Sequence, residues 1–183
     1  MSRKSGIDGR PGVKIPADDL RRGLAVARDD KDGGLAHIAV VGDTYTILLT
    51  GKDTKGRFCL IDMLVPPGGG PPPHRHDFEE TFILLEGEVD VTFRGKKSVA
   101  RAGVTVNVPS NAPHQFHNSS NKPARLLCIC SPAGMENFFL QMGIPVKSRT
   151  SPAPKLDKEA QEKLGAKLKK LAPKFRTEML KSA

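Results

Sequence analysis

The sequence lacks several features that would assign it to common protein classes. No stretch approaches the roughly 18 apolar residues of a membrane span, and the first dozen residues are polar and glycine-rich where a secretory signal needs an apolar run. Tryptophan is absent and aromatic residues make up only 5% of the chain, which leaves few rings for stacking on nucleic-acid bases. We therefore expect a soluble, cytoplasmic protein with no membrane partner and no nucleic-acid partner.

Cysteine is also scarce. Cys59, Cys128 and Cys130 are an odd number of cysteines without C-x-x-C spacing, so neither a zinc ribbon nor a disulfide framework is indicated. Cys128 and Cys130 share one face if the segment "RLLCIC" is a strand. Buried thiols are the favoured interpretation. A second metal site or a redox role is the alternative.

The net charge of +9 is concentrated in the last part of the chain. Residues 147–183 hold eleven Lys and Arg against four Asp and Glu, so seven of the nine net positive charges lie there. Apolar residues recur in this part at steps of three and four, the period of an amphipathic helix: Leu156, Ala160, Leu164, Leu168, Leu171, Phe175 and Met179. We predict a helix from about 158 to 171, capped by Asp157, with a shorter turn or helix beyond Pro173. Its apolar stripe is expected to pack on the chain's own domain; an acidic partner or anionic lipid is the alternative.

Between residues 36 and 131 the chain is a series of short segments rich in β-branched and aromatic residues, separated by Gly, Pro, Asn, Asp and Ser. This pattern predicts an all-β core, either a sandwich or a barrel. We divide the chain into an N-terminal arm (1–34) with a short helix near 17–27, a β domain (35–146) with a small helix near 134–143, and a proline-rich linker with the basic helix (147–183).

One segment of the β domain, "PPPHRHDFEETFILLEG", is unusually rich in histidine and carboxylate side chains. Alternation along a strand places His74 and His76 on the same side, about 6.6 Å apart. Glu80 would lie too far along a straight strand to share an ion with them. The chain must therefore turn at 77–79, and Glu80 would then begin an antiparallel neighbour and face back across a hairpin. A shift of one residue would make Glu79 the inward carboxylate instead.

A further histidine comes from the segment "VPSNAPHQFHN". Here a turn follows Pro109, and the returning strand places His114 and Phe116 on one face. His117 points to the opposite face and is interpreted as a surface or structural residue, as is His37.

These motifs resemble those of the cupin superfamily. The first cupin motif spaces glycine, two histidines, glutamate and glycine as found here at Gly68, His74, His76, Glu80 and Gly87. The second is matched by Gly103, Pro109, His114 and Asn118, with Asn111 in place of its middle glycine. Asn is the non-glycine residue that best tolerates a left-handed turn. The flanking segments "PGGGPPPHRH" and "SPAGMENFF" resemble single-domain bacterial cupins of the quercetin dioxygenase-like kind.

The resemblance implies a cupin double-stranded β-helix, a jelly-roll barrel, with a divalent transition metal held inside by His74, His76, Glu80 and His114. The ion would be Fe, Mn, Ni, Co, Cu or Zn, with open positions for small molecules. By the same alternation, Phe82 and Phe116 face inward and are candidate walls of a substrate pocket. Cupins commonly pair through an N-terminal arm, so a homodimer is expected.

The leading functional hypothesis is a quercetinase-like dioxygenase acting on a flavonol, a diketone or a related enolisable small molecule. In addition to its role as a ligand, Glu80 is the candidate catalytic residue, because it is the carboxylate nearest to the substrate's hydroxyl proton. A metal-dependent isomerase or lyase is the alternative enzyme. A non-catalytic cupin that binds a metal or a small molecule is the alternative outside enzymology.

Overall fold

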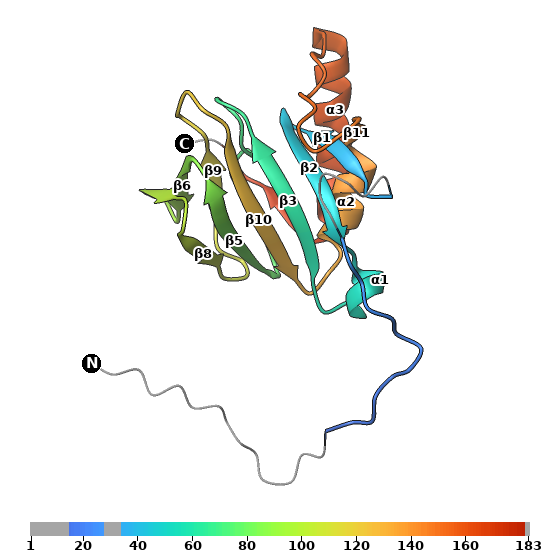
Figure 1. Ribbon diagram of the computed structural model, residues 1–183. Helices are drawn as coiled ribbons and strands as arrows, with labels where there is room; N and C mark the ends of the chain where they lie inside the picture. Colours follow the sequence, from blue (N-terminus) through green and yellow to red (C-terminus); the bar gives the residue numbers. More distant parts are fainter. Residues whose placement is uncertain (1–14, 28–33, 182–183) are drawn as a thin grey trace, which may run out of the picture.

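The computed structural model describes residues 15–27 and 34–181 (Figure 1). Much of the predicted N-terminal arm, residues 1–14 and 28–33, therefore lies outside the described residues. Within 17–27 the predicted helix is wrong, because the chain forms only a turn at Leu20 and Arg21. The side chains of Leu20 and Leu24 are about nine-tenths exposed. A short helix with no buried apolar face has nothing to offset the cost of its nucleation.

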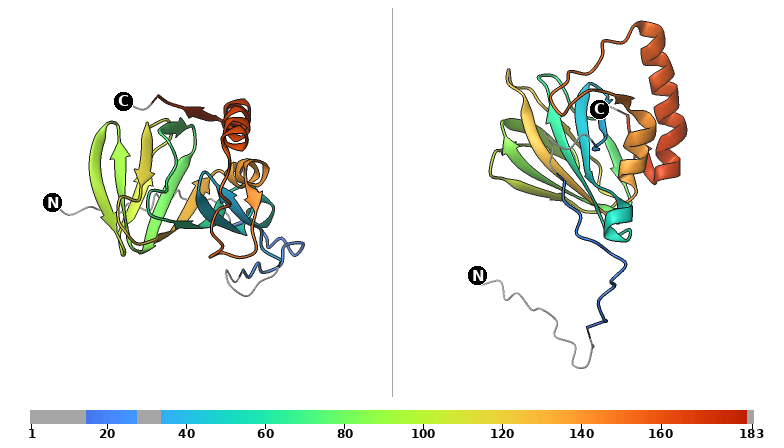
Figure 2. Two further views of the ribbon diagram at one scale, coloured as in Figure 1. Left: turned by 90° about the horizontal axis from the view of Figure 1, so that it is seen from above. Right: turned by 45° about the vertical axis from the view of Figure 1, so that its right-hand side comes forward.

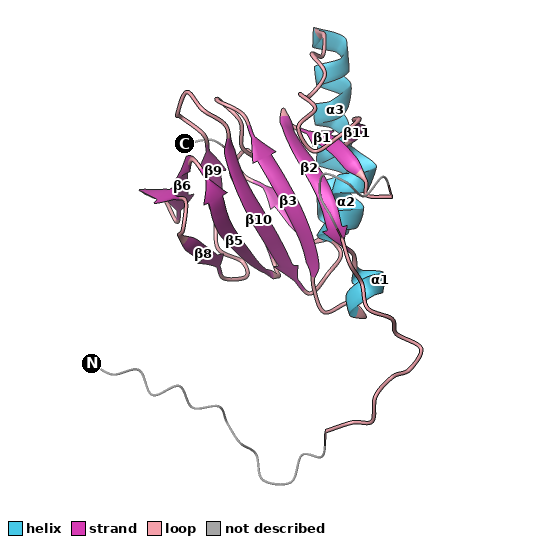
Figure 3. Ribbon diagram, in the orientation of Figure 1, coloured by secondary structure: helices cyan, strands magenta, loops and turns pink. Residues whose placement is uncertain are grey.

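Two antiparallel sheets form the body of the protein (Figures 1 and 3). The seven-stranded sheet contains, in spatial order, β11 (Ile144–Pro145), β1 (His37–Val40), β2 (Asp43–Leu49), β3 (Cys59–Val65), β10 (Ala124–Ser131), β5 (Glu79–Glu86) and β8 (Thr105–Val108). The five-stranded sheet contains, in spatial order, β12 (Thr177–Met179), β4 (His74–His76), β9 (His114–His117), β6 (Glu88–Phe93) and β7 (Lys96–Arg101).

The sheets enclose one apolar core, which confirms the predicted all-β jelly roll. A barrel closes only when the edge strands of its sheet pair with each other. Among the described residues no strand pairing joins one sheet to the other, so the predicted barrel is an open two-sheet arrangement. A long strand such as β10 still alternates as expected, with Leu126, Cys128 and Cys130 buried and the residues between them partly exposed.

Helices cover one side of the molecule (Figures 1 and 2). They are α1 (Gly51–Thr54), α2 (Met135–Met142), α3 (Lys158–Leu171) and the 3₁₀ turn η1 (Ala172–Phe175). The predicted C-terminal helix is confirmed, and Oδ1 of its N-cap Asp157 accepts a hydrogen bond of 2.8 Å from the Ala160 amide. Its apolar stripe, including Leu164, Leu168 and Leu171, packs against the core, as expected. None of the helices in the described ranges is long and apolar enough to cross a membrane.

Two features differ from the expected local structure. β4 and β5 do not form a hairpin: β4 pairs with β9 and β12, whereas β5 pairs with β10 and β8. The chain crosses between the two sheets at Asp77 and Phe78. Beyond η1, the chain then forms strand β12, which pairs antiparallel with β4 in the register Thr177 to His76 and Met179 to His74. The C-terminal segment is therefore part of the five-stranded sheet (Figure 2).

Candidate metal centre

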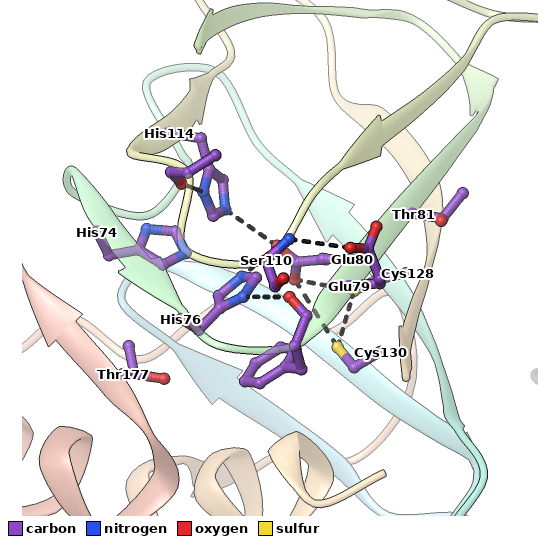
Figure 4. A network of polar contacts seen from close by, with 12 residues as sticks. His74, His76, Glu79, Glu80, Thr81, Ser110, His114, Cys128, Cys130 and Thr177 are labelled. Atoms are coloured by element: carbon purple, nitrogen blue, oxygen red, sulfur yellow. Dashed lines mark hydrogen bonds and ion pairs between the residues drawn. The ribbon is translucent and has the colours of Figure 1, made fainter. Parts of the chain in front are cut away.

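Three histidines from neighbouring strands converge in the space between the sheets (Figure 4). His74 and His76 lie on β4 with one residue between them, so their side chains leave the strand on the same side. His114 of β9 is paired directly with His74. All three rings are buried, with 8% or less of each residue exposed.

Each of these rings is oriented by a backbone carbonyl two residues away. The Nδ1 atoms of His74, His76 and His114 lie 2.9, 3.0 and 2.9 Å from the carbonyl oxygens of Pro72, Phe78 and Ala112. A carbonyl oxygen only accepts, so Nδ1 carries the proton and donates it. The lone pair of the neutral ring is then on Nε2, the arrangement found in histidines that bind metals. His76 is also stacked on Phe78, with ring centroids 3.8 Å apart.

Glu80 completes the cluster from the opposite sheet. Its Oε2 atom lies 3.0 Å from Nε2 of His76 and 3.0 Å from Nε2 of His114. One ligand atom from each of the four residues lies within 4.8 Å of the others, and all four residues are buried. The expected convergence of these side chains is thus present, although Glu80 reaches the histidines across the two sheets and not across a hairpin.

The two glutamates of "DFEET" have different surroundings. Glu79 is exposed and accepts hydrogen bonds from Asn107 Nδ2 and the Ser110 amide, both 3.0 Å long. The register in which Glu79 points inward is therefore not found.

The two remaining histidines lie outside the cluster, as expected. His117 is exposed, and the His37 ring contacts Thr46 Oγ1 at 2.8 Å.

Burial and charge together set the protonation of the cluster. Burial alone would raise the pKa of Glu80, but its contacts with Nε2 of His114 and of His76, which donate to it when the rings are protonated, outweigh burial and hold this pKa well below its usual range. Burial, reinforced by the nearby charge of His114, lowers the pKa of His74 to about 4. Burial opposes protonation of His114 as well, yet its contact with Glu80 raises its pKa. At neutral pH the cluster contains an ionised carboxylate and a neutral His74.

The turns that carry the ligands depend on special backbone conformations. Asn111, which replaces a motif glycine, has φ +67°, and its amide donates a 2.6 Å hydrogen bond to the His76 carbonyl. Asn therefore takes the left-handed conformation expected at this position. Gly70 has φ +122°, and a Cβ atom there would lie 2.2 Å from the Phe116 carbonyl oxygen. Only glycine lets this segment pass so close to β9.

A small apolar cavity of about 50 Å³ adjoins the cluster. His74 and Glu80 form part of its wall, and Phe82 and Phe116, both buried as expected, form another part with ring centroids 5.3 Å apart. A further part of the wall was not anticipated from the sequence. It comes from α2 and from the C-terminal segment, through Met135, Phe138, Phe139, Met142, Leu168, Thr177 and Met179. The helical spacing of Leu168 and Met179 indicated that they pack inward, but not against which part of the protein.

On the other side of β12 lies an outer cleft of about 610 Å³. Its lining includes Arg75, His76, Asn111 and Lys169. Thr177 and Met179 line both the cavity and the cleft, so β12 is the partition between them.

The fold, the motif spacing and the geometry of the cluster agree with the family that a comparison with known protein families identifies. Residues 61–130 match the family described as Cupin domain. The chain is 32% identical over 111 residues to an uncharacterized protein of Methanocaldococcus jannaschii, covering 60% of this chain and 89% of that protein. This chain belongs to the cupin superfamily.

Two further relatives are informative. The chain is 26% identical over 139 residues to quercetin 2,3-dioxygenase of Bacillus subtilis; the match covers 70% of this chain but only 41% of that enzyme. Among solved structures, a predicted oxalate decarboxylase from Thermotoga maritima has a TM-score of 0.52 at 22% identity, covering 58% of this chain and 98% of that chain. The structural likeness supports the fold alone.

Proposed function

We propose that this chain binds one divalent transition metal through His74, His76, Glu80 and His114, and that it is a dioxygenase acting on an enolisable small molecule of the flavonol or diketone type. The observation that carries the proposal is the convergence of four donor atoms on one place. They are Oε2 of Glu80 and the Nε2 atoms of three histidines, and in each histidine ring a backbone carbonyl holds the Nδ1 atom. Three imidazoles and one carboxylate suit Fe²⁺, Mn²⁺, Ni²⁺, Co²⁺, Cu²⁺ or Zn²⁺.

A metal held by four protein ligands would supply Lewis-acid stabilisation of an enolate oxygen and two further positions for other molecules. The remaining functions fall to the chain's own side chains. Phe82 and Phe116 are proposed to hold the apolar part of a planar substrate, since both rings line the cavity beside Glu80. The same rings exclude water, which strengthens electrostatic interactions at the site.

Glu80 is proposed to accept the hydroxyl proton of the substrate in addition to its role as a ligand. It is the carboxylate that lines the cavity, so its oxygens are the acceptors closest to a bound molecule. With the metal bound, Nε2 of His76 and Nε2 of His114 would face the ion, so Glu80 would accept a proton only when its own bond to the ion loosens as a substrate binds. Proton transfer is therefore coupled to substrate binding.

The size of the cavity narrows the choice of substrate. Pockets for small molecules usually measure about 300 Å³ or more, whereas this cavity measures about 50 Å³. A short diketone needs only a modest expansion, but a three-ring flavonol needs the cavity to join the outer cleft. We therefore propose small diketones as the first compounds to test.

The metal site is tested by elemental analysis of protein purified without added metal. We expect one ion bound by the histidine cluster, and His76→Ala should lose most of it while remaining folded. His117→Ala is the matched control, because this histidine lies on the same segment as His114 but is exposed. Equal metal content in His76→Ala and the wild type would overturn the proposed site.

The reaction is tested by oxygen uptake. Protein reconstituted with each candidate metal is mixed with pentane-2,4-dione or quercetin, and a dioxygenase should consume oxygen in proportion to substrate loss. Equal conversion under argon would instead identify an isomerase or lyase. Binding without conversion would identify a non-catalytic cupin. The homodimer, the cytoplasmic location, the lack of a nucleic-acid partner and the domain boundaries at 34 and 146 stay predictions from the sequence.

A further inference from the structure

The three cysteines form a buried group directly behind Glu80. Cys59, Cys128 and Cys130 are each 0% exposed. In the seven-stranded sheet, Cys130 of β10 is paired with Cys59 of β3 on one side and with Glu80 of β5 on the other. Cys128 precedes Cys130 by two residues and therefore lies on the same face. The proposed dioxygenase mechanism uses none of these thiols.

The two thiols nearest Glu80 are spaced like ligands of a single ion. Sγ of Cys128 lies 3.7 Å from Sγ of Cys130, and these two sulfurs lie 3.2 and 3.8 Å from Oε1 of Glu80. Two sulfurs at about 2.3 Å from a tetrahedral ion are separated by roughly 3.8 Å. One point about 2.3 Å from both sulfurs and about 2.0 Å from the oxygen satisfies all three observed distances together.

The two oxygens of Glu80 face different groups (Figure 4). Oε2 is directed at His76 and His114, whereas Oε1 is directed at Cys128 and Cys130. A carboxylate has enough lone pairs to serve a different partner with each oxygen. An ion bound by the two cysteines and an ion bound by the histidines therefore do not compete for the same oxygen of Glu80.

We propose that Cys128, Cys130 and Oε1 of Glu80 form a second metal site, which shares only Glu80 with the histidine cluster and is selective for thiophilic ions such as Zn²⁺, Cd²⁺ or Cu⁺. Thiolates select such ions, whereas the histidine and carboxylate donors accept a wider range. Binding breaks the S–H bond of each cysteine, forms two metal–sulfur bonds and releases two protons to solvent. With both sites filled, Glu80 bridges the two ions.

The test is an anaerobic titration of the full-length reduced protein with Co²⁺, followed by absorbance. Cobalt bound by thiolates gives an intense near-ultraviolet charge-transfer band, whereas cobalt bound by histidine and carboxylate gives only weak visible bands. We expect two equivalents to bind, one of them with the sulfur band. Cys128→Ser/Cys130→Ser should lose that band and one equivalent, and His74→Ala/His114→Ala should lose the other equivalent and keep the band. Cys59→Ser is the matched control, and it should keep both.

The outcomes separate this proposal from the histidine centre. A single equivalent without the sulfur band overturns the thiol site and leaves the histidine site standing. A single equivalent with the sulfur band overturns the histidine site and leaves the thiol site standing. Should the serine variants fail to fold, ¹¹³Cd nuclear magnetic resonance of the wild-type protein decides, because sulfur ligands shift the cadmium signal far downfield of nitrogen and oxygen ligands. A cadmium spectrum without a sulfur-ligated signal would equally overturn the proposal.

Discussion

Removing β12 should expose the proposed metal centre to solvent. In a chain that ends after Arg176, the partition between the inner cavity of about 50 Å³ and the outer cleft of about 610 Å³ is gone, because Thr177 and Met179 line both. A chain that ends after Leu180 is the matched control. It keeps all of β12 and the hydrogen bond of 2.8 Å from the Leu180 amide to the Pro73 carbonyl.

The magnitude follows from what holds the strand in place. Arg176 pairs with Asp77 at 2.7 Å and Glu178 with Arg75 at 2.5 Å, and all four side chains are substantially exposed. Such exposed pairs contribute about 0.5 kcal/mol each. The pairing of Thr177, Glu178 and Met179 with β4, together with the half-burial of Met179, stabilises the closed state. This contribution is about 2 kcal/mol after the entropy of ordering the strand is subtracted. The state with β12 in place is therefore favoured by roughly 3 kcal/mol over the open state, in which β12 has detached. The open state is then about 100-fold less populated than the closed state.

The assay is the rate at which an excess of chelator removes Co²⁺ or Zn²⁺ from the histidine cluster. In the wild type, β12 should open and close many times before the metal is removed, so the observed rate should be proportional to the population of the open state. The chain ending after Arg176 should release metal about 100-fold faster, and the chain ending after Leu180 should behave as the wild type. Equal rates in all three proteins would refute the closure of the site by β12.

Two further predictions concern buried carboxylates. Burial raises the pKa of Asp43 to about 7, so the stability that it contributes is complete below about pH 4 and is lost as the pH rises through 7. The free energy of unfolding of Asp43→Asn, measured in urea, should therefore rise relative to that of the wild type by up to about 4 kcal/mol between pH 4 and pH 8. A difference between the two proteins that does not change with pH would contradict this. Asp62 is fully buried and bonded to Nε and Nη2 of Arg125. Arg125→Met should cost about 3–5 kcal/mol, and the double variant Asp62→Leu/Arg125→Met should recover most of it; no recovery would show that the cost comes from packing.

Much of this structure could be predicted from local sequence patterns. The range 158–171 of the C-terminal helix follows from its apolar period and its Asp157 cap, and both are found. The inward direction of His74, His76 and His114 follows from the two-residue alternation of strands. These signals need only neighbouring residues, so no knowledge of the tertiary structure is required to interpret them.

The parts that were wrong or missed depend on contacts between distant segments. Nothing local shows that β4 and β5 belong to different sheets, because a turn at 77–79 serves a hairpin and a crossing between sheets equally well. The helical period included Met179, yet that residue lies in β12, because the pairing of β12 with β4 joins segments about 100 residues apart. Such pairing leaves little signal in the tail itself.

The central claim is that four side chains from two sheets bind a single ion, and a crystal structure with anomalous diffraction at the metal absorption edge tests it most directly. We predict an anomalous peak about 2.0–2.2 Å from Nε2 of His74, His76 and His114 and from Oε2 of Glu80. A metal-loaded crystal with no peak among these four atoms, or with Glu80 or His114 turned toward solvent, would contradict it.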